Sequence, residues 1–235
     1  MKTNIPERIA ALREAMRQQK VDAYIIPSSD PHLSEYPADR WKSREWISGF
    51  TGSAGTIVVT ADKAGLWTDS RYFLQAASQL EGSGIELYKL ALPETPSITE
   101  FLLHELHAGQ AVGLDGQTYS AAEASALANK LNRKEIKLDT SADLIEGIWK
   151  DRPAVPGNPI FEMPEALSGA SVHEKLDLIN NQLRSEGADC LILAALDEIA
   201  WTFNIRGTDV TYNPVVVSYA FVSEDESVLF IKPEK

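Results

Sequence analysis

Apolar residues recur with helical spacing close to the N-terminus. Ile9, Leu12 and Met16 lie at positions i, i+3 and i+7, and charged or amide side chains fill most of the positions between them. This pattern predicts an amphipathic helix over residues 6–20. The segment 21–26 is short, apolar and partly β-branched, which predicts a buried strand after that helix.

Further strands and helices are expected to alternate up to residue 131. The segments 56–60 and 65–68 predict two strands of a hairpin, and Asp69-Ser70 predicts the cap of a helix that runs to about Leu80. The remaining predicted elements are a strand at 85–90, a helix at 97–107, a strand at 112–115 and a helix at 120–131. Such alternation is typical of an α/β layered domain with a mixed sheet, for which residues 1–152 suffice.

Glycine recurs every three residues at Gly49, Gly52 and Gly55. A phosphate-binding loop would place its glycines after a strand and before a helix, whereas here a predicted strand follows them. A close backbone approach or a tight turn is therefore the expected use of these glycines.

A proline-rich segment separates this domain from the rest of the chain. Three prolines and Gly157 fall within residues 153–159, which cannot continue a helix or a central strand and predict a stiff linker. After the linker, the pattern of the first helix returns at a distance of 167 positions. The paired residues are Ile9 with Leu176, Leu12 with Ile179, Met16 with Leu183, Arg17 with Arg184, Asp22 with Asp189, Ile25 with Ile192 and Asp30 with Asp197.

Beyond a loop twelve residues shorter in the second copy, Trp46 and Gly52 pair with Trp201 and Gly207. These matches predict an internal duplication. The second copy, residues 160–235, has the first helix, the first strand and a hairpin of 215–222 with 228–231. We expect a chain cut within its second domain, with an unpaired sheet edge prone to self-association.

The stretch 196–214 gathers polar and aromatic groups between two apolar runs, which predicts a loop that holds binding groups. One alternative is a surface connection whose Trp201 packs into the core. Another is that Arg206 pairs with Asp209 and shapes its own loop. The candidate binding residues are Asp197, Glu198, Trp201, Arg206, Asp209, Tyr212 and Asn213.

Composition limits the classes of function. The 235 residues are 44% hydrophobic and 24% charged, which is typical of a globular protein, and a net charge of -12 argues against nucleic-acid and anionic membrane partners. The single Cys190 excludes an intrachain disulfide and is expected to be a small core residue. The sequence contains no signal peptide or membrane span, so the expected location is the cytoplasm.

Five stretches together resemble the three-domain Xaa-Pro aminopeptidases of the creatinase/prolidase superfamily: residues 23–28, 48–56, 67–77, 148–153 and 196–214. The resemblance covers nearly the whole chain in order. It implies a three-layer αβα domain with a mixed sheet, like the creatinase N-terminal domain, present twice with the second copy truncated.

The resemblance also implies where the chemistry lies. In this family a pair of divalent ions, usually manganese, is held by five side chains of a C-terminal catalytic domain, and none of those ligands has a counterpart here. The expectation is that this chain contains no catalytic or metal-binding residue, needs no cofactor of its own and is inactive alone. Its implied part is to cover the active site and to support a homodimer.

The substrates implied are peptides with proline in the second position. In binding such a peptide, Arg206 would hold a carbonyl of the substrate or an acidic side chain of the catalytic domain. The carboxylates of Asp197, Glu198 and Asp209 would attract the ammonium group of the substrate. Tyr212 and Asn213 would line the wall of the substrate cavity. Two alternatives stay open: a prolidase or creatinase, which would carry one such domain, and a creatinase-like protein-binding module without enzymatic activity.

Overall fold

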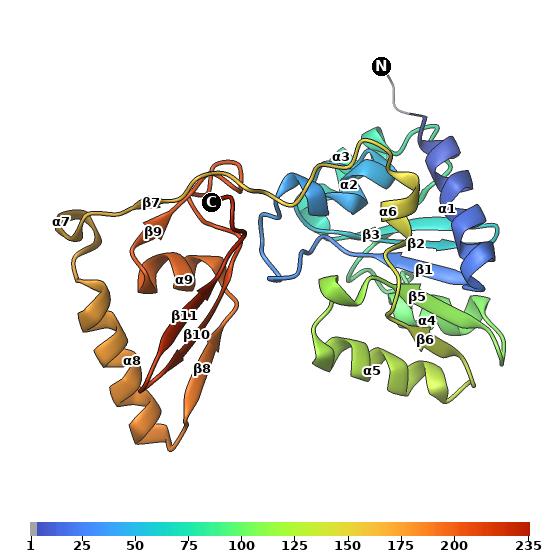
Figure 1. Cartoon of the computed structure of the whole chain (residues 1–235). Coiled ribbons are helices and arrows are strands. Elements are labelled where there is room, and N and C mark those ends of the chain that lie inside the picture. The colour runs from blue at the N-terminus through green and yellow to red at the C-terminus, as the bar shows by residue number, and fades with distance from the viewer. Residues whose placement is uncertain (1–3) are drawn as a thin grey trace. The chain divides into compact units, whose positions relative to one another are not determined.

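The computed structural model describes residues 4–235, which group into two compact units (Figure 1). Unit 1 comprises the residues up to Glu35 together with Trp41–Pro153, and unit 2 comprises Tyr36–Arg40 with Ala154–Lys235. No helix within residues 4–235 combines the length and the apolar character needed to cross a bilayer.

Unit 1 contains a mixed sheet with the strand order β4-β3-β2-β1-β5-β6. Antiparallel pairs join β1 to β2 and β2 to β3, whereas β1–β5, β5–β6 and β3–β4 are parallel. The strands are β1 (Ala23–Ile26), β2 (Thr56–Thr60), β3 (Ala64–Thr68), β4 (Glu86–Lys89), β5 (Ala111–Leu114) and β6 (Lys137–Asp139). The predicted mixed sheet and the hairpin of β2 with β3 are confirmed.

Helices cover both faces of this sheet, which gives the expected three layers. Figure 1 shows α1, α2, α3 and α6 on one face and α4 and α5 on the other. The helices are α1 (Ile5–Gln19), α2 (Ser43–Ser48), α3 (Phe73–Gln79), α4 (Ile98–Glu105), α5 (Ala121–Asn132) and α6 (Leu144–Ile148). Short 3-10 turns are η1 (Asp39–Trp41), η2 (Ser70–Tyr72) and η3 (Gly116–Thr118).

Local sequence explains several helix boundaries. Ser97 and Ser120 each form a capping box with the glutamate three residues later, and these boxes begin α4 and α5 as predicted. The predicted helix after Asp69 is instead η2 followed by α3, although the Asp69 carboxylate does accept a hydrogen bond from the Arg71 N–H at 3.0 Å.

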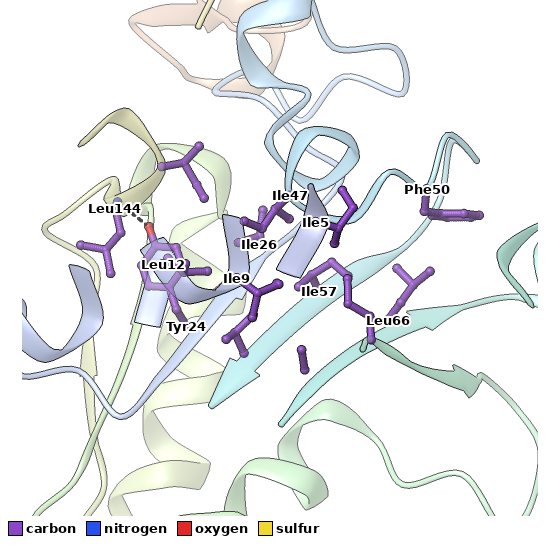
Figure 2. Packing of buried hydrophobic residues seen from close by; sticks show 14 of the residues in the cluster. Ile5, Ile9, Leu12, Tyr24, Ile26, Ile47, Phe50, Ile57, Leu66 and Leu144 are labelled. Atoms are coloured by element: carbon purple, nitrogen blue, oxygen red, sulfur yellow. Dashed lines mark hydrogen bonds between the residues drawn. The ribbon is translucent and has the colours of Figure 1, made fainter. Parts of the chain in front are cut away.

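The strand β1 is buried on both sides. Leu12 of α1 packs with Tyr24 and Ile26 in one apolar cluster, and Figure 2 shows the Tyr24 hydroxyl reaching toward Leu144. Ile25 points to the other face, where α4 and α5 supply apolar cover. This two-sided burial explains why 23–26 is continuously apolar rather than alternating.

The glycine-rich segment of unit 1 is used for a close approach, as predicted. A Cβ added at Gly52 would lie 2.3 Å from Cζ of Phe50 and 2.7 Å from Cδ1 of Tyr72. The buried guanidinium of Arg44 donates hydrogen bonds to the backbone carbonyls of Phe50 and Gly52, which fixes the path of the segment. Burial lowers the pKa of Arg44 to about 10.

Unit 2 contains a three-stranded sheet with the order β11-β10-β8 and a short β7–β9 pair. Its core combines Leu193, Ile199, Ala220 and Val222. The strands are β7 (Phe161–Glu162), β8 (Cys190–Leu193), β9 (Ile205–Arg206), β10 (Tyr219–Ser223) and β11 (Ser227–Phe230). The helices are α7 (Glu165–Ser168), α8 (Val172–Glu186) and α9 (Leu196–Thr202).

Unit 2 repeats the first elements of unit 1 in order and register. The helix α8 and the strand β8 have the same lengths as α1 and β1 and begin 167 positions after them. The pairs Ala23↔Thr60 and Thr56↔Trp67 of unit 1 correspond to Cys190↔Ser223 and Tyr219↔Phe230 of unit 2. The αL residues that end the two helices, Lys20 and Gly187, are also 167 positions apart. The structure thus has the repeated arrangement expected of a duplication.

The prediction that Cys190 is a core residue is wrong, because its side chain is exposed. Its counterpart Ala23 is fully buried beneath the layer that contains α4 and α5. No described element of unit 2 supplies a matching layer, so the same position in the strand lies at the surface.

Candidate functional site

The stretch predicted as a loop begins with a helix, so this part of the prediction is wrong. The helix α9 buries Leu196, Ile199 and Ala200 against the sheet of unit 2, a spacing that follows the helical period. Polar residues are so frequent in this stretch that its helical spacing of apolar residues was not recognised from the sequence. Asp197 and Glu198 occupy the first turn, where the positive end of the helix dipole favours carboxylates.

Three of the seven candidate residues line one groove. Asp197, Glu198 and Trp201 of α9 face a hollow of about 470 Å³. The rest of its lining is mainly apolar and comes from α8 and β8: Ile179, Leu191, Ile192 and Leu193, with Thr202 of α9. The groove therefore offers apolar contact beside two exposed carboxylates.

Lys175 is fully buried next to this groove, which sequence analysis did not anticipate. Its ammonium donates hydrogen bonds to the Trp201 carbonyl at 2.8 Å and to Oδ1 of Asn204, and it lies 4.6 Å from the centroid of the Trp201 ring. Burial, and then the charge of Arg206, lower the pKa of Lys175. This lysine fixes the side chain of Trp201 from the inner side.

The role of Lys175 could have been inferred from its counterpart in the first copy. Arg8 lies 167 positions earlier, and its guanidinium donates a hydrogen bond to the Trp46 carbonyl and lies 4.4 Å from the centroid of that ring. Burial also lowers the pKa of Arg8. Both copies thus place a cation of the first helix over an equivalent tryptophan, although Lys175 is fully buried and Arg8 is half-buried.

Arg206 does not pair with Asp209, so this part of the alternative is wrong. The Arg206 guanidinium donates hydrogen bonds to the carbonyls of Ala200 at 2.7 Å and Ile205 at 2.9 Å, which shapes its own turn. Asp209 is buried, accepts a hydrogen bond from the Val217 N–H at 2.8 Å and forms an ion pair with Lys235. Both residues stabilise unit 2 from within.

Tyr212 and Asn213 lie at the tip of the stretch. Tyr212 is fully exposed and has a positive φ of 63°. Asn213 is half-buried, and its N–H donates a hydrogen bond to the Val210 carbonyl at 3.3 Å. The structure therefore divides the seven candidates among a groove, a loop interior and an exposed tip.

Between residues 4 and 235, no group of three or more His, Cys, Asp or Glu side chains comes together in a way that could hold a metal ion. The residues present do not fit a di-metal centre. The chemistry that the groove supplies is apolar contact and attraction of a cation.

Both units match the family models described as the Creatinase/Prolidase N-terminal domain, over residues 8–148 and residues 151–235. A "Probable Xaa-Pro aminopeptidase P" from Laccaria bicolor is 41% identical over 97% of this chain, which covers 36% of that protein. A protein of the same name from Coprinopsis cinerea is 42% identical over 97% of the chain, with 37% of its own length covered.

A solved structure has the same fold over nearly the whole chain. The X-prolyl aminopeptidase from Caenorhabditis elegans, described as a cytosolic enzyme with a di-nuclear active site, matches with a TM-score of 0.92 and 32% identity. The match covers 98% of this chain and 39% of that enzyme. The chain thus spans 36 to 39% of the length of these three proteins.

Proposed function

Because the chain belongs to the creatinase/prolidase N-terminal domain family, we propose that it is the N-terminal part of a metal-dependent Xaa-Pro aminopeptidase. Such an enzyme releases the residue that precedes a proline at the N-terminus of a peptide. The observation that carries the proposal is the 41% identity to a protein of that name over 97% of the chain. The second family-model match supports it over a prolidase or creatinase, for which one such domain is expected.

The bond-breaking step belongs, in this proposal, to polypeptide outside this chain. The C. elegans relative is described as having a di-nuclear active site, and residues 4–235 do not gather the donors for one. Two divalent ions, with manganese expected, would activate a water and polarise the carbonyl ahead of proline. This chain binds no metal in the proposal and hydrolyses nothing alone.

The part proposed for this chain is to cover the active site and to support a homodimer in the cytoplasm, where the C. elegans enzyme is described. Among the candidates, Asp197, Glu198, Trp201 and Tyr212 are exposed and available to groups outside unit 2. The carboxylates would attract the ammonium of a peptide, and Tyr212 with Asn213 would line its path. Arg206 and Asp209 act indirectly, by fixing the shape of the stretch.

An activity comparison tests the proposal. Two proteins are compared: the 235-residue chain, and the longer protein of which the proposal makes it the N-terminal part. Each is incubated with manganese and a tripeptide that has proline in the second position, and a tripeptide with alanine in that position is the control. The expected result is cleavage of the proline peptide by the longer protein alone, lost after chelation. Cleavage by the 235-residue chain, or none by the longer protein, would contradict it, and the second outcome would favour a protein-binding module.

A further inference from the structure

A hollow of about 480 Å³ lies in unit 1 where α1 ends and where β1 and β5 begin. Its lining includes Arg13 and Arg17 of α1 and Lys20, which directly follows that helix. Asp22 and Gln110, which directly precede β1 and β5, also line it. The volume is within the range of sites that bind small molecules.

The charge of this lining is opposite to that of the whole chain. The chain has 34 acidic residues against 22 lysines and arginines, whereas the lining has three cations and one carboxylate. The Asp22 carboxylate already accepts hydrogen bonds, from Nε2 of Gln110 at 3.0 Å and from the Ala111 N–H at 2.9 Å. The lining therefore has two positive charges in excess and attracts anions.

Two of the three cations have no acidic partner among the described residues, namely Arg13 and Lys20. Nε of Arg13 donates a hydrogen bond to the Thr60 carbonyl at 2.9 Å, and no described residue accepts a hydrogen bond from its two Nη atoms. This bond fixes the plane of the guanidinium and leaves the Nη groups for a ligand. Arg17 is exposed and forms an ion pair with Glu14, so it contributes less.

Lys20 occupies a backbone conformation that favours glycine. Its φ is 56°, and the residue at the equivalent position of unit 2 is Gly187, with a φ of 65°. A Cβ is disfavoured in this left-handed region, so a lysine destabilises the end of α1 relative to a glycine. Backbone strain of this kind is concentrated at functional positions, and a ligand for the Lys20 ammonium would account for it.

The dipole of α1 explains only part of this arrangement. Cations in the last turn of a helix are favoured by the partial negative charge there, which applies to Arg17 and Lys20 but not to Arg13 in the middle of the helix. In unit 2, α8 has the same length as α1 with only one of the three cations, because Asn180 and Gly187 stand at the positions of Arg13 and Lys20. The helix itself therefore does not require them.

The lining matches the chemistry of a phosphate monoester. Such a group carries a charge of about −2 at pH 7 and presents three acceptor oxygens, which suits two positive charges in excess. A planar guanidinium donates two parallel hydrogen bonds to a pair of phosphate oxygens, and the Nη groups of Arg13 are available for this. Met16, Val21 and Ala61 add apolar lining, which offers contact to the organic part of the ester.

We propose that the hollow at the end of α1 binds a phosphate monoester of a small organic molecule. The Nη groups of Arg13 and the ammonium of Lys20 contact the phosphate, and Arg17 adds to the positive field. The organic part lies against the apolar lining. The proposal stands apart from peptidase activity, because every residue that it uses lies within unit 1 and none takes part in bond cleavage.

Amide NMR spectra of the isotope-labelled 235-residue chain measure this binding. The probe is phenyl phosphate, and saturable shifts at Lys20, Val21 and Gly109 are expected with a dissociation constant of about 1 mM. Inorganic phosphate lacks the apolar part of the probe, and phenyl sulfate carries a single negative charge. Both should bind several-fold more weakly than phenyl phosphate, because each loses one of the two contributions.

Three variants separate binding from folding. Lys20→Gly copies Gly187 of unit 2, so unit 1 should keep or gain resistance to urea and yet bind phenyl phosphate about tenfold more weakly. Arg13→Gln should also weaken binding about tenfold, since the guanidinium is lost. Arg184→Gln removes the cation of α8 that corresponds to Arg17 and is the matched control, which should leave the dissociation constant unchanged.

The absence of saturable shifts at about 10 mM phenyl phosphate would overturn the proposal. Equal weakening by Arg184→Gln would overturn it as well, because binding would then depend only on the overall charge of the chain. Unchanged binding in both Lys20→Gly and Arg13→Gln would show that the hollow is not the site. Equal binding of phenyl sulfate would overturn the assignment to a phosphate monoester.

Discussion

The contacts of Lys175, the buried cation of unit 2, predict how much free energy of unfolding is lost when its charge is removed. In Lys175→Met the apolar part of the side chain is kept and the ammonium is lost. The carbonyl of Trp201 and the buried amide oxygen of Asn204 then lose a hydrogen-bond donor. An acceptor left unsatisfied in the interior costs about 1–3 kcal/mol.

Part of this cost is offset, because the variant no longer buries a positive charge. Burial lowers the pKa of Lys175, which means that the charged form is destabilised in the folded state. The Trp201 carbonyl also keeps the hydrogen bond from the Asn204 N–H at 3.4 Å, so we expect unit 2 to lose about 1–3 kcal/mol of its free energy of unfolding. Lys175→Arg keeps a hydrogen-bonding cation at this position, as Arg8 does in unit 1, and should therefore cost less than Lys175→Met.

Hydrogen exchange followed by mass spectrometry measures this effect in each unit separately. Peptides from α8, β8 and β10 should exchange faster in Lys175→Met, while peptides from β1, β2 and β5 keep their rates. Equal losses in Lys175→Met and Lys175→Arg would refute the reasoning, because the hydrogen-bonded cation would then not be the cause. A loss spread over both units would refute it as well.

The lowered pKa of Lys175 also predicts how the stability of unit 2 depends on pH. Between the lowered pKa of folded Lys175 and its ordinary value of 10.5, the unfolded chain binds more protons than the folded chain. The stability of unit 2 should therefore rise with pH across this window in the wild type, relative to Lys175→Met. A rise of the same size in the methionine variant would show that another group titrates.

Three further predictions concern other parts of the chain. Tyr24→Phe removes the hydroxyl bonded to the Leu144 N–H and the Ala142 carbonyl, so unit 1 should lose about 1–3 kcal/mol in urea unfolding. Burial raises the pKa of Tyr24 above 10, so the wild type should also lose stability with rising pH there while the variant does not. Gly52→Ala should cost about 1–3 kcal/mol because its Cβ meets the Phe50 ring, and a neutral result would show that the ring moves freely. Tyr212→Ala should leave unfolding unchanged to within about 0.5 kcal/mol, since the side chain is fully exposed, but raise KM in the longer enzyme; an unchanged KM would remove Tyr212 from the peptide path.

Sequence periodicity was sufficient for the parts of the fold that repeat or alternate regularly. The apolar spacing of Ile9, Leu12 and Met16 gave α1, and the same spacing after the linker gave α8. The starts predicted at residues 97 and 120 agree with those of α4 and α5, which Ser97 and Ser120 cap. The short elements α2, β6 and α6 have too few residues for a period, so their existence depends on contacts that are distant in sequence.

The candidate site was harder to predict because its residues serve different partners. Local sequence suggested that Arg206 and Asp209 would form an ion pair. Instead, Arg206 donates hydrogen bonds to backbone carbonyls and Asp209 forms an ion pair with Lys235. Cys190 was expected in the core because its neighbours in sequence are apolar. Its exposure depends instead on whether a layer of helices covers that face of β8, which local sequence does not show. Lys175 could have been recognised from its correspondence to Arg8.

A crystal structure of this chain tests the central claim most directly, namely that unit 2 repeats the opening elements of unit 1. The account predicts that α8, β8, β10 and β11 superimpose on α1, β1, β2 and β3. It also predicts that Cys190 pairs with Ser223 as Ala23 pairs with Thr60. A different strand order in unit 2, or a register shifted by even one residue between β8 and β10, would contradict it.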